Sequence, residues 1–253
     1  MVYDIQKAGF WKRLSAWFLD AILLLFLAVG ASLILSPMLQ FDSYSDTVDA
    51  ISQRYEAETG VSFDITAEEY QKMSETDRAK FDEAYGKFAA DEEAIHAYNM
   101  LISLSILIVS LSIFLSCLVL EFLIPLALKN GQTIGKKIFG LGVMRAHGVK
   151  VEGVCMFIRS ILGKYTIEIM VPVMLITMMF WNILGGMGII VLALMALLQV
   201  ILLIATRNNS AIHDYLAHTV VVELQSQMIF ENEDELLAYK KRIHEEMANR
   251  STY

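Results

Sequence analysis

Four long apolar segments dominate this chain and limit what it can fold into. They run over residues 14–36, 99–128, 165–181 and 188–205. A helix needs about 20 mainly apolar residues to cross a bilayer, within a range of roughly 17–25. Hydrophobic residues make up 56% of the chain, and the excess over a soluble domain is concentrated in these segments. The pattern predicts an all-α membrane protein with four transmembrane helices.

The first apolar segment also has features of a cleaved signal peptide, because Lys7, Lys12 and Arg13 precede it. A signal core usually has only about 7–15 apolar residues, and this segment is longer. It also contains Asp20. We therefore expect a retained transmembrane helix.

Basic residues fall on one side of the four expected helices. They precede the first helix, occupy the connection between the second and third, and follow the fourth: Lys7, Lys12, Arg13, Lys129, Lys136, Lys137, Arg145, Lys150, Arg159, Lys164 and Arg207. The positive-inside rule makes that side cytoplasmic. We expect a multi-pass protein of the cell membrane with both termini in the cytoplasm.

The connection 38–98 is expected to be an extracytoplasmic helical insertion. Its residues 42–93 carry 15 acidic and 5 basic side chains. Helix-start patterns begin at Thr66 and Ser74. Three aromatic residues then recur at helical spacing: Phe81, Tyr85 and Phe88. A solvated acidic helical cap is therefore expected, rather than a calcium loop, whose ligand spacing is missing.

The cytoplasmic part is expected to comprise the loop 129–164 and a C-terminal region with a helix beginning near Asn232. Residues 141–151 alternate weakly, which suggests a short hairpin joined by residues 218–222. Residues 154–165 have the amphipathic pattern of an interfacial helix. The full expected division is 1–37, 38–98, 99–128, 129–164, 165–205 and 206–253.

Three of the expected transmembrane helices contain an acidic residue, namely Asp20, Glu121 and Glu168. A charged side chain in the bilayer costs at least ~2.5–3.5 kcal/mol on insertion scales, so it rarely persists without a partner or a function. The expected topology puts all three near the cytoplasmic face. Arg13 lies seven residues before Asp20, on the same side of the helix and about 10.5 Å away along its axis.

Two explanations of these acids remain open. They are either paired charges that hold the helices in register, or a proton or cation site, since burial raises the pKa of a carboxyl group. An arginine close to Asp20 favours the first explanation, because it keeps the carboxylate ionised.

Enzyme chemistry is not expected. His213 and Asp214 are adjacent, so on a helix their side chains point about 100° apart, and no nucleophile accompanies them. The segment 131–137 lacks the spacing of a phosphate loop. Cys117 and Cys155 show no metal-site or disulfide pattern, so no metal or cofactor is expected. A net charge of −8 argues against nucleic acid as a partner.

Three motifs resemble those of the RDD family of small bacterial membrane proteins. They are Gly9-Phe10-Trp11-Lys12-Arg13 followed by Asp20, the segment Asn130–Leu141, and the segment Ser210–Val221. The arginine and two aspartates of the family name correspond here to Arg13, Asp20 and Asp214. The last motif departs from the family pattern at His218, where glycine is usual. The insertion and the residues after Glu223 are additions to it.

The resemblance implies a membrane fold and, for some members, transport that includes sodium–proton exchange. We expect ion or small-solute transport, with Asp20 as the intramembrane acid and Arg13 and Asp214 as its cytoplasmic partners. Glu121, Glu168 and His213 complete the expected charge network. Because four helices make a thin wall, transport implies a homo-oligomer in the lipid bilayer. The alternative is a membrane scaffold or regulatory subunit that binds a membrane protein partner through the insertion and the C-terminal tail.

Overall fold

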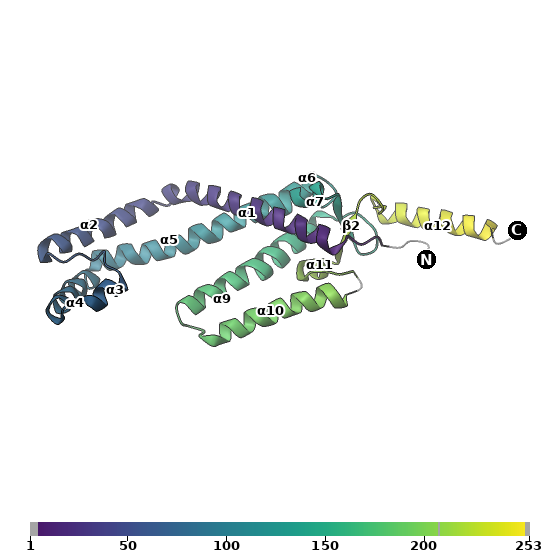
Figure 1. The fold of residues 1–253 in the computed structure, drawn as a ribbon. Helices are drawn as coiled ribbons and strands as arrows, with labels where there is room; N and C mark the ends of the chain where they lie inside the picture. Colours follow the sequence, from purple (N-terminus) through teal and green to yellow (C-terminus); the bar gives the residue numbers. More distant parts are fainter. Residues whose placement is uncertain (1–4, 207, 251–253) are drawn as a thin grey trace. The chain divides into compact units, whose positions relative to one another are not determined.

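A computed structural model describes residues 5–206 and 208–250, so that Arg207 lies outside the described residues. Four of its helices are long and apolar enough to span a membrane, which confirms the four expected segments (Figure 1). These spans are Phe10–Met38, Glu92–Ala127, Gly153–Phe180 and Gly186–Ala205. The described residues form two compact units, residues 28–112 and the remainder, and each is described by itself below.

Two of the four spans contain a π-helical stretch. The second consists of α5 (Glu92–Cys117), η1 (Leu118–Leu123) and α6 (Ile124–Ala127). The third consists of α8 (Gly153–Phe157), η2 (Ile158–Met170) and α9 (Val171–Phe180). The first and fourth are the regular helices α1 (Phe10–Met38) and α10 (Gly186–Ala205). π-Helical turns are rare and occur frequently at functional sites.

The third span begins at Gly153, well before the expected start at Tyr165. The segment expected to be a separate interfacial helix is therefore the first part of this span. Arg159 and Lys164 lower the hydropathy of the segment, but the fold pairs both with acidic side chains. Both basic side chains therefore lie inside the fold, 2% and 12% exposed, and not at a membrane surface as the sequence suggested.

The third and fourth spans form a tight hairpin through the short link 181–185, which carries no charge. The helices α9 and α10 run side by side (Figure 1). Asn182 and Gly185 both have positive φ angles, 56° and 50°, which turn the chain within a few residues. At Gly188 a Cβ atom would lie 2.4 Å from Cγ of Met179, so the close approach of the helices requires glycine.

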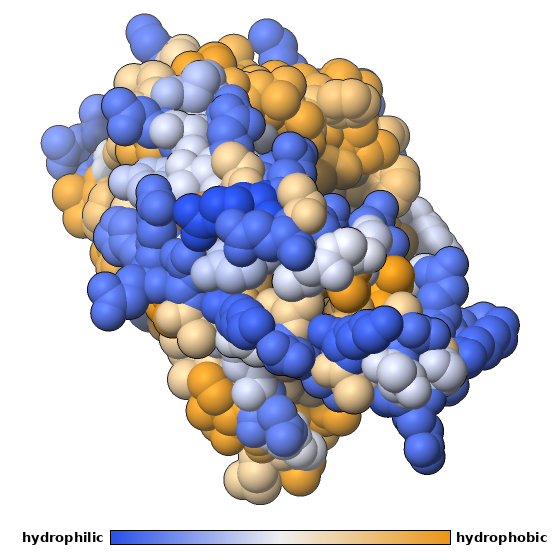
Figure 2. All heavy atoms as spheres, turned by 90° about the vertical axis from the view of Figure 1, so that its left-hand side faces the viewer, coloured by the Kyte–Doolittle hydropathy of each residue, from blue (hydrophilic) through white to orange (hydrophobic). Residues whose placement is uncertain are grey.

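The unit of residues 28–112 holds the expected helical insertion. It contains α2 (Phe41–Thr59), α3 (Ala67–Lys72) and α4 (Glu75–Ala89), and hydrophilic residues dominate the insertion surface that faces the viewer in Figure 2. Thr66 caps α3 with a complete capping box, and Ser74 caps α4. Both helix starts predicted from the sequence are therefore confirmed.

An aromatic cluster joins the segment before α3 to α4, with three partly buried rings and Tyr85 exposed. The ring of Phe63 lies 5.9, 5.7 and 5.5 Å, centroid to centroid, from the rings of Phe81, Tyr85 and Phe88. These are the three aromatic residues that recur at helical spacing along α4. Aromatic pairs at such distances add to the stability supplied by burial alone.

The second unit contains several further elements besides the spans. They are α7 (Ile134–Ile138), β1 (Leu141–Arg145), α11 (Ile212–Leu216), β2 (Thr219–Glu223) and α12 (Glu233–Arg250). Strand β1 pairs antiparallel with β2, with Val143 opposite Val221. The suggested junction of residues 141–151 with residues 218–222 is thus present. Ala8 and Ala16 pack against this sheet.

The expected hairpin over residues 141–151 is present in short form, with an antiparallel bridge between Met144 and Lys150. The amide of Arg145 donates to the carbonyl of Val149 at 2.8 Å, and Gly148 has a φ of 100°. Further on, the Asn232 side chain accepts from the amide of Glu235 at 2.8 Å at the start of α12. The two-stranded sheet β1–β2 is thus followed on one side by this turn and on the other by α12.

Candidate functional site

Nine ionisable side chains gather in the second unit, and we call them the charged layer. They come from α1, η1, α7, η2 and α11: Arg13, Asp20, Glu121, Lys136, Arg159, Lys164, Glu168, His213 and Asp214. Four are lysine or arginine and four are aspartate or glutamate, so the layer is neutral when His213 is neutral. Five of the nine are buried, and the other four are partly buried. Buried charge on this scale is stable only when it is paired.

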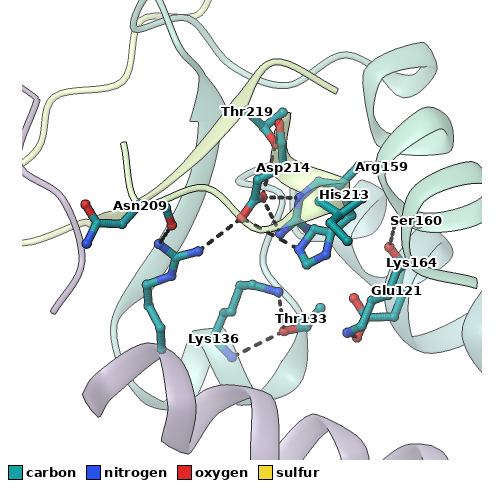
Figure 3. A network of polar contacts seen from close by, with 12 residues as sticks. Glu121, Thr133, Lys136, Arg159, Ser160, Lys164, Asn209, His213, Asp214 and Thr219 are labelled. Carbon is teal, nitrogen blue, oxygen red and sulfur yellow. Dashed lines mark hydrogen bonds and ion pairs between the residues drawn. The ribbon is translucent and has the colours of Figure 1, made fainter. Parts of the chain in front are cut away.

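Asp214 is the most heavily bound member of the charged layer (Figure 3). Nε and Nη2 of Arg159 both lie 2.9 Å from its Oδ1, and Nη2 of Arg13 lies 3.1 Å from its Oδ2. The hydroxyl of Thr219 also donates to Oδ1, at 3.2 Å. Asp214 thus connects α1, η2 and β2.

Two arginines decide the charge state of Asp214. Burial alone would raise the pKa of this carboxyl group, but the charges of Arg159, His213 and Arg13 together outweigh burial. The pKa of Asp214 is therefore held well below its usual range. Such a carboxylate stays ionised at physiological pH and cannot serve as a proton carrier there.

The expectation that Arg13 and Asp214 are partners of Asp20 is wrong in its pairing. Arg13 bonds to Asp214 and, through Nη1, to the carbonyl of Asn209 at 2.6 Å. Asp20 is two helical turns further along α1, about 10.5 Å along the axis, which exceeds the range of a direct ion pair. A shared helix face does not bring the two side chains together.

Asp20 instead binds the beginning of α7. Its Oδ2 accepts a hydrogen bond of 2.5 Å from the hydroxyl of Thr133, and its Oδ1 accepts one of 2.7 Å from the amide of Gly135. Gly135 permits this approach, because a Cβ atom there would lie 2.3 Å from the carbonyl oxygen of Ala16. The intramembrane acid expected from the sequence is therefore saturated by polar groups of α7.

Lys136 is buried and lies next to Thr133 (Figure 3). Its Nζ donates to Oγ1 of Thr133 at 3.3 Å, and no carboxylate among the described residues lies within ion-pair distance of it. Burial and, next, the charge of Arg159 lower the pKa of Lys136 to about 8. Glu121 and Asp20 offset part of this effect through their negative charges.

Glu121 lies in η1 and forms an ion pair with Lys164 through its Oε1. The backbone carbonyl of Glu121 accepts a hydrogen bond of 2.5 Å from the hydroxyl of Ser160. Its Oε2 is buried and has no hydrogen-bond partner among the described residues. An oxygen in this condition costs free energy of about 1–3 kcal/mol or more, which makes Glu121 the least satisfied acid of the layer.

Glu168 and His213 form a separate pair. Nδ1 of His213 lies 2.9 Å from both carboxylate oxygens of Glu168, and the backbone amide of His213 donates to Oε1 at 3.1 Å. Gly163 allows α11 to approach η2, since a Cβ there would lie 2.7 Å from Cα of His213. From α10, the Gln199 side chain accepts from the amide of Ile212 at 3.1 Å.

The π-helical geometry of η2 explains how one helix supplies three members of the layer. A π-helix closes i→i+5 hydrogen bonds, so each turn takes more than four residues. Arg159, Lys164 and Glu168 are separated by five and four residues. On an α-helix, side chains at these spacings would point in different directions around the axis. On η2 the wider turns direct all three toward one side.

Asp20, Glu121 and Glu168 therefore make three separate sets of contacts, with Thr133 and Gly135, with Lys164, and with His213. Two surface cavities, of about 360 and about 140 Å³, are lined by other residues. No group of three or more His, Cys, Asp or Glu side chains in the described part of the chain is placed to hold a metal ion.

Sequence reasoning did not place Thr133, Lys136 or Arg159 in the site. Arg159 belongs to the segment expected to be an interfacial helix, and Thr133 and Lys136 belong to the segment 131–137, which lacks the spacing of a phosphate loop. One feature of the sequence points to the basic residues of the site. Each buried acid in a span needs a partner, and several lysines and arginines lie next to the spans that carry acids.

The model of the RDD family matches residues 7–218, which is most of the chain and includes every member of the charged layer. No curated protein and no protein of known structure matches the chain.

Proposed function

The chain belongs to the RDD family, and from this membership we propose that it is a membrane transporter that exchanges protons for a cation or another small ion. The observation that carries the proposal is Glu121. This buried acid lies in a span, shares one oxygen with Lys164 and leaves the other without a hydrogen-bond partner among the described residues. Intramembrane acids of this kind mark ion and proton pathways by default.

The Glu121–Lys164 pair has the chemistry that such exchange requires. The ammonium of Lys164 occupies the position that an incoming cation would take at Glu121. A monovalent cation can take the place of the ammonium at the carboxylate, and the exchange is neutral when one proton leaves the site as the cation enters. One positive charge leaves as a proton and one enters as the cation, so the buried pair stays neutral throughout.

The test is proton flux in vesicles that contain the purified protein, driven by a gradient of sodium or potassium and followed with a pH-sensitive dye. We expect Glu121→Gln to abolish the flux, because the amide cannot hold a cation by charge. Glu152→Gln is the matched control, since this acid is exposed and pairs only loosely, at 3.5 Å, with Arg145. Equal flux in Glu121→Gln and the wild type would refute the role of Glu121.

Transport by this fold requires more than one copy of the chain. Only 6% of the most apolar window of α10 is buried, so most of this helix is open to lipid or to another subunit. We propose a homo-oligomer in the cell membrane with both termini in the cytoplasm, as the distribution of basic residues requires. Reporter fusions at each end test the orientation, and crosslinking in membranes tests the assembly.

A scaffold or regulatory role is the second candidate, and α12 favours it. This helix lies outside the spans, and Leu237 and Met247 leave 62% and 47% of their surface exposed. Leu236 packs into the core of the unit, so a truncation must begin beyond it. Deleting residues 242–253 should preserve membrane insertion and abolish binding of a membrane protein partner, and an unchanged set of co-purifying proteins would refute this role.

A further inference from the structure

We propose that Lys136, Thr133 and Asp20 form a proton relay that serves the exchange proposed above, with Lys136 as the proton-binding residue. This inference rests on the proposed function and assigns it a site beside the Glu121–Lys164 pair. The three residues come from α1 and from the beginning of α7, and two hydrogen bonds connect them in series. All three are buried.

The direction of the hydrogen bonds makes the relay continuous. Nζ of Lys136 donates to Oγ1 of Thr133 at 3.3 Å, and the same hydroxyl donates to Oδ2 of Asp20 at 2.5 Å. A hydroxyl carries one donor and two acceptor positions, so it can receive a proton from one neighbour while it gives its own to the other. Thr133 is therefore placed to pass a proton between a buried ammonium and a buried carboxylate.

The proton transfer balances in atoms and charge. The Nζ–H bond of Lys136 breaks and its proton bonds to Oγ1 of Thr133, while the hydroxyl proton of Thr133 bonds to Oδ2 of Asp20. The ammonium becomes an amine, the carboxylate becomes a carboxylic acid, and the threonine hydroxyl is regenerated. The reverse transfer restores both charges.

Burial and the charged groups around Lys136 together lower its pKa, so that it can release its proton near neutral pH. From η2, Arg159 and Lys164 repel the ammonium, and from η1 and α1, Glu121 and Asp20 attract it. Burial adds to the repulsion and lowers the pKa of Lys136 to about 8. Since Glu121 and Lys164 act on Lys136 electrostatically, a change of charge at the exchange pair alters proton binding at the relay.

The first experiment measures the protonation of Lys136 without any transport. The purified full-length protein is acylated with acetic anhydride between about pH 6 and pH 11, a range that covers an ordinary lysine pKa of about 10.4. Mass spectrometry reads the modification of Lys136 and of its exposed neighbour Lys137, which serves as the internal reference. We expect Lys136 to react with a midpoint at lower pH than Lys137, and Asp20→Asn and Thr133→Val to lower that midpoint further. Equal midpoints for the two lysines, or a midpoint that neither variant moves, would overturn the proposal.

The second experiment measures flux in the vesicle assay. Thr133→Val keeps the shape of the side chain and removes the hydroxyl, whereas Thr133→Ser keeps the hydroxyl. We expect Thr133→Val and Lys136→Arg to lower the flux by roughly tenfold or more, because valine cannot pass a proton and arginine does not release one. Thr133→Ser should restore most of the flux that Thr133→Val loses, and Lys137→Arg, outside the relay, should transport as the wild type does.

The outcomes separate the two proposals. Flux that survives in Thr133→Val and Lys136→Arg refutes the relay and leaves proton–cation exchange intact. A wild type without flux at any pH refutes the exchange, and the acylation midpoints then decide whether Lys136 binds a proton in contact with Asp20. Thermal unfolding of each variant identifies a loss of flux that results from misfolding, and the Thr133→Ser and Thr133→Val pair keeps the test decisive if Lys136→Arg does not fold.

Discussion

Replacing Asp214 by asparagine removes the carboxylate that Arg13 and Arg159 share. Three nitrogen–oxygen contacts of 2.9–3.1 Å lose their charge, and the Arg159 side chain, 2% exposed, keeps a buried positive charge without a counter-charge. Breaking a buried ion pair from one side costs ~3–5 kcal/mol. Because the asparagine oxygen can still accept one hydrogen bond, we expect a loss of about 3 kcal/mol in the free energy of unfolding.

Unfolding in mixed micelles by titration with sodium dodecyl sulfate, followed by circular dichroism, measures this loss. The control is Glu152→Gln, whose exposed pair with Arg145 is worth at most ~1 kcal/mol. The double variant Arg159→Met with Asp214→Leu removes the most deeply buried pair together, and it should recover most of the lost stability, since apolar replacements of buried pairs are often neutral. A loss below ~1 kcal/mol in Asp214→Asn would show that the pairing does not hold the charged layer together.

Two further predictions concern α7. Gly135→Ala should lower the free energy of unfolding by ~2–4 kcal/mol, through overpacking against Ala16 and loss of bonds to Asp20. In the control Gly153→Ala the new Cβ meets no atom within 4 Å, so the free energy of unfolding should change by less than ~1 kcal/mol. Equal unfolding midpoints for the two variants would refute the close approach at Gly135. Lys136 has a pKa of about 8 in the folded protein and 10.5 as a reference, so the unfolded chain binds more protons between these values and the stability should rise with pH there. The measured quantity is the free energy of unfolding of the wild type minus that of Lys136→Met. It should increase by at most ~3 kcal/mol between pH 8 and pH 10.5. A value that stays constant across this range would contradict the burial of the Lys136 charge.

The four spans and the two helix caps of the insertion were predictable from the sequence, and the reason is physical. Hydropathy summed over about 20 residues does not depend on which neighbour a residue meets. A capping box at Thr66 is complete within four residues. Such features are local or additive, so they survive without knowledge of the tertiary structure.

The start of the third span and the pairing of the charges were not predictable in the same way. The hydropathy of residues 153–164 counts Arg159 and Lys164 as exposed charges, although both are paired in the fold. The reasoning at Asp20 compared residues on one helix, while its actual partners are more than 110 residues away in the chain. A period of 3.6 residues also misplaces the side chains of η2, whose turns are wider.

The pairing of Asp214 sets an order of events during synthesis. Arg13 precedes Asp214 by 201 residues and Arg159 precedes it by 55. At about 5–20 residues per second, Arg13 is made roughly 10–40 s before its carboxylate exists. Throughout that interval the first helix enters the bilayer with an uncompensated guanidinium at its edge. The Asp214 carboxylate, which connects the first span to the third, is therefore synthesised after both of its arginine partners. A nascent chain that stops before α11 cannot form this connection.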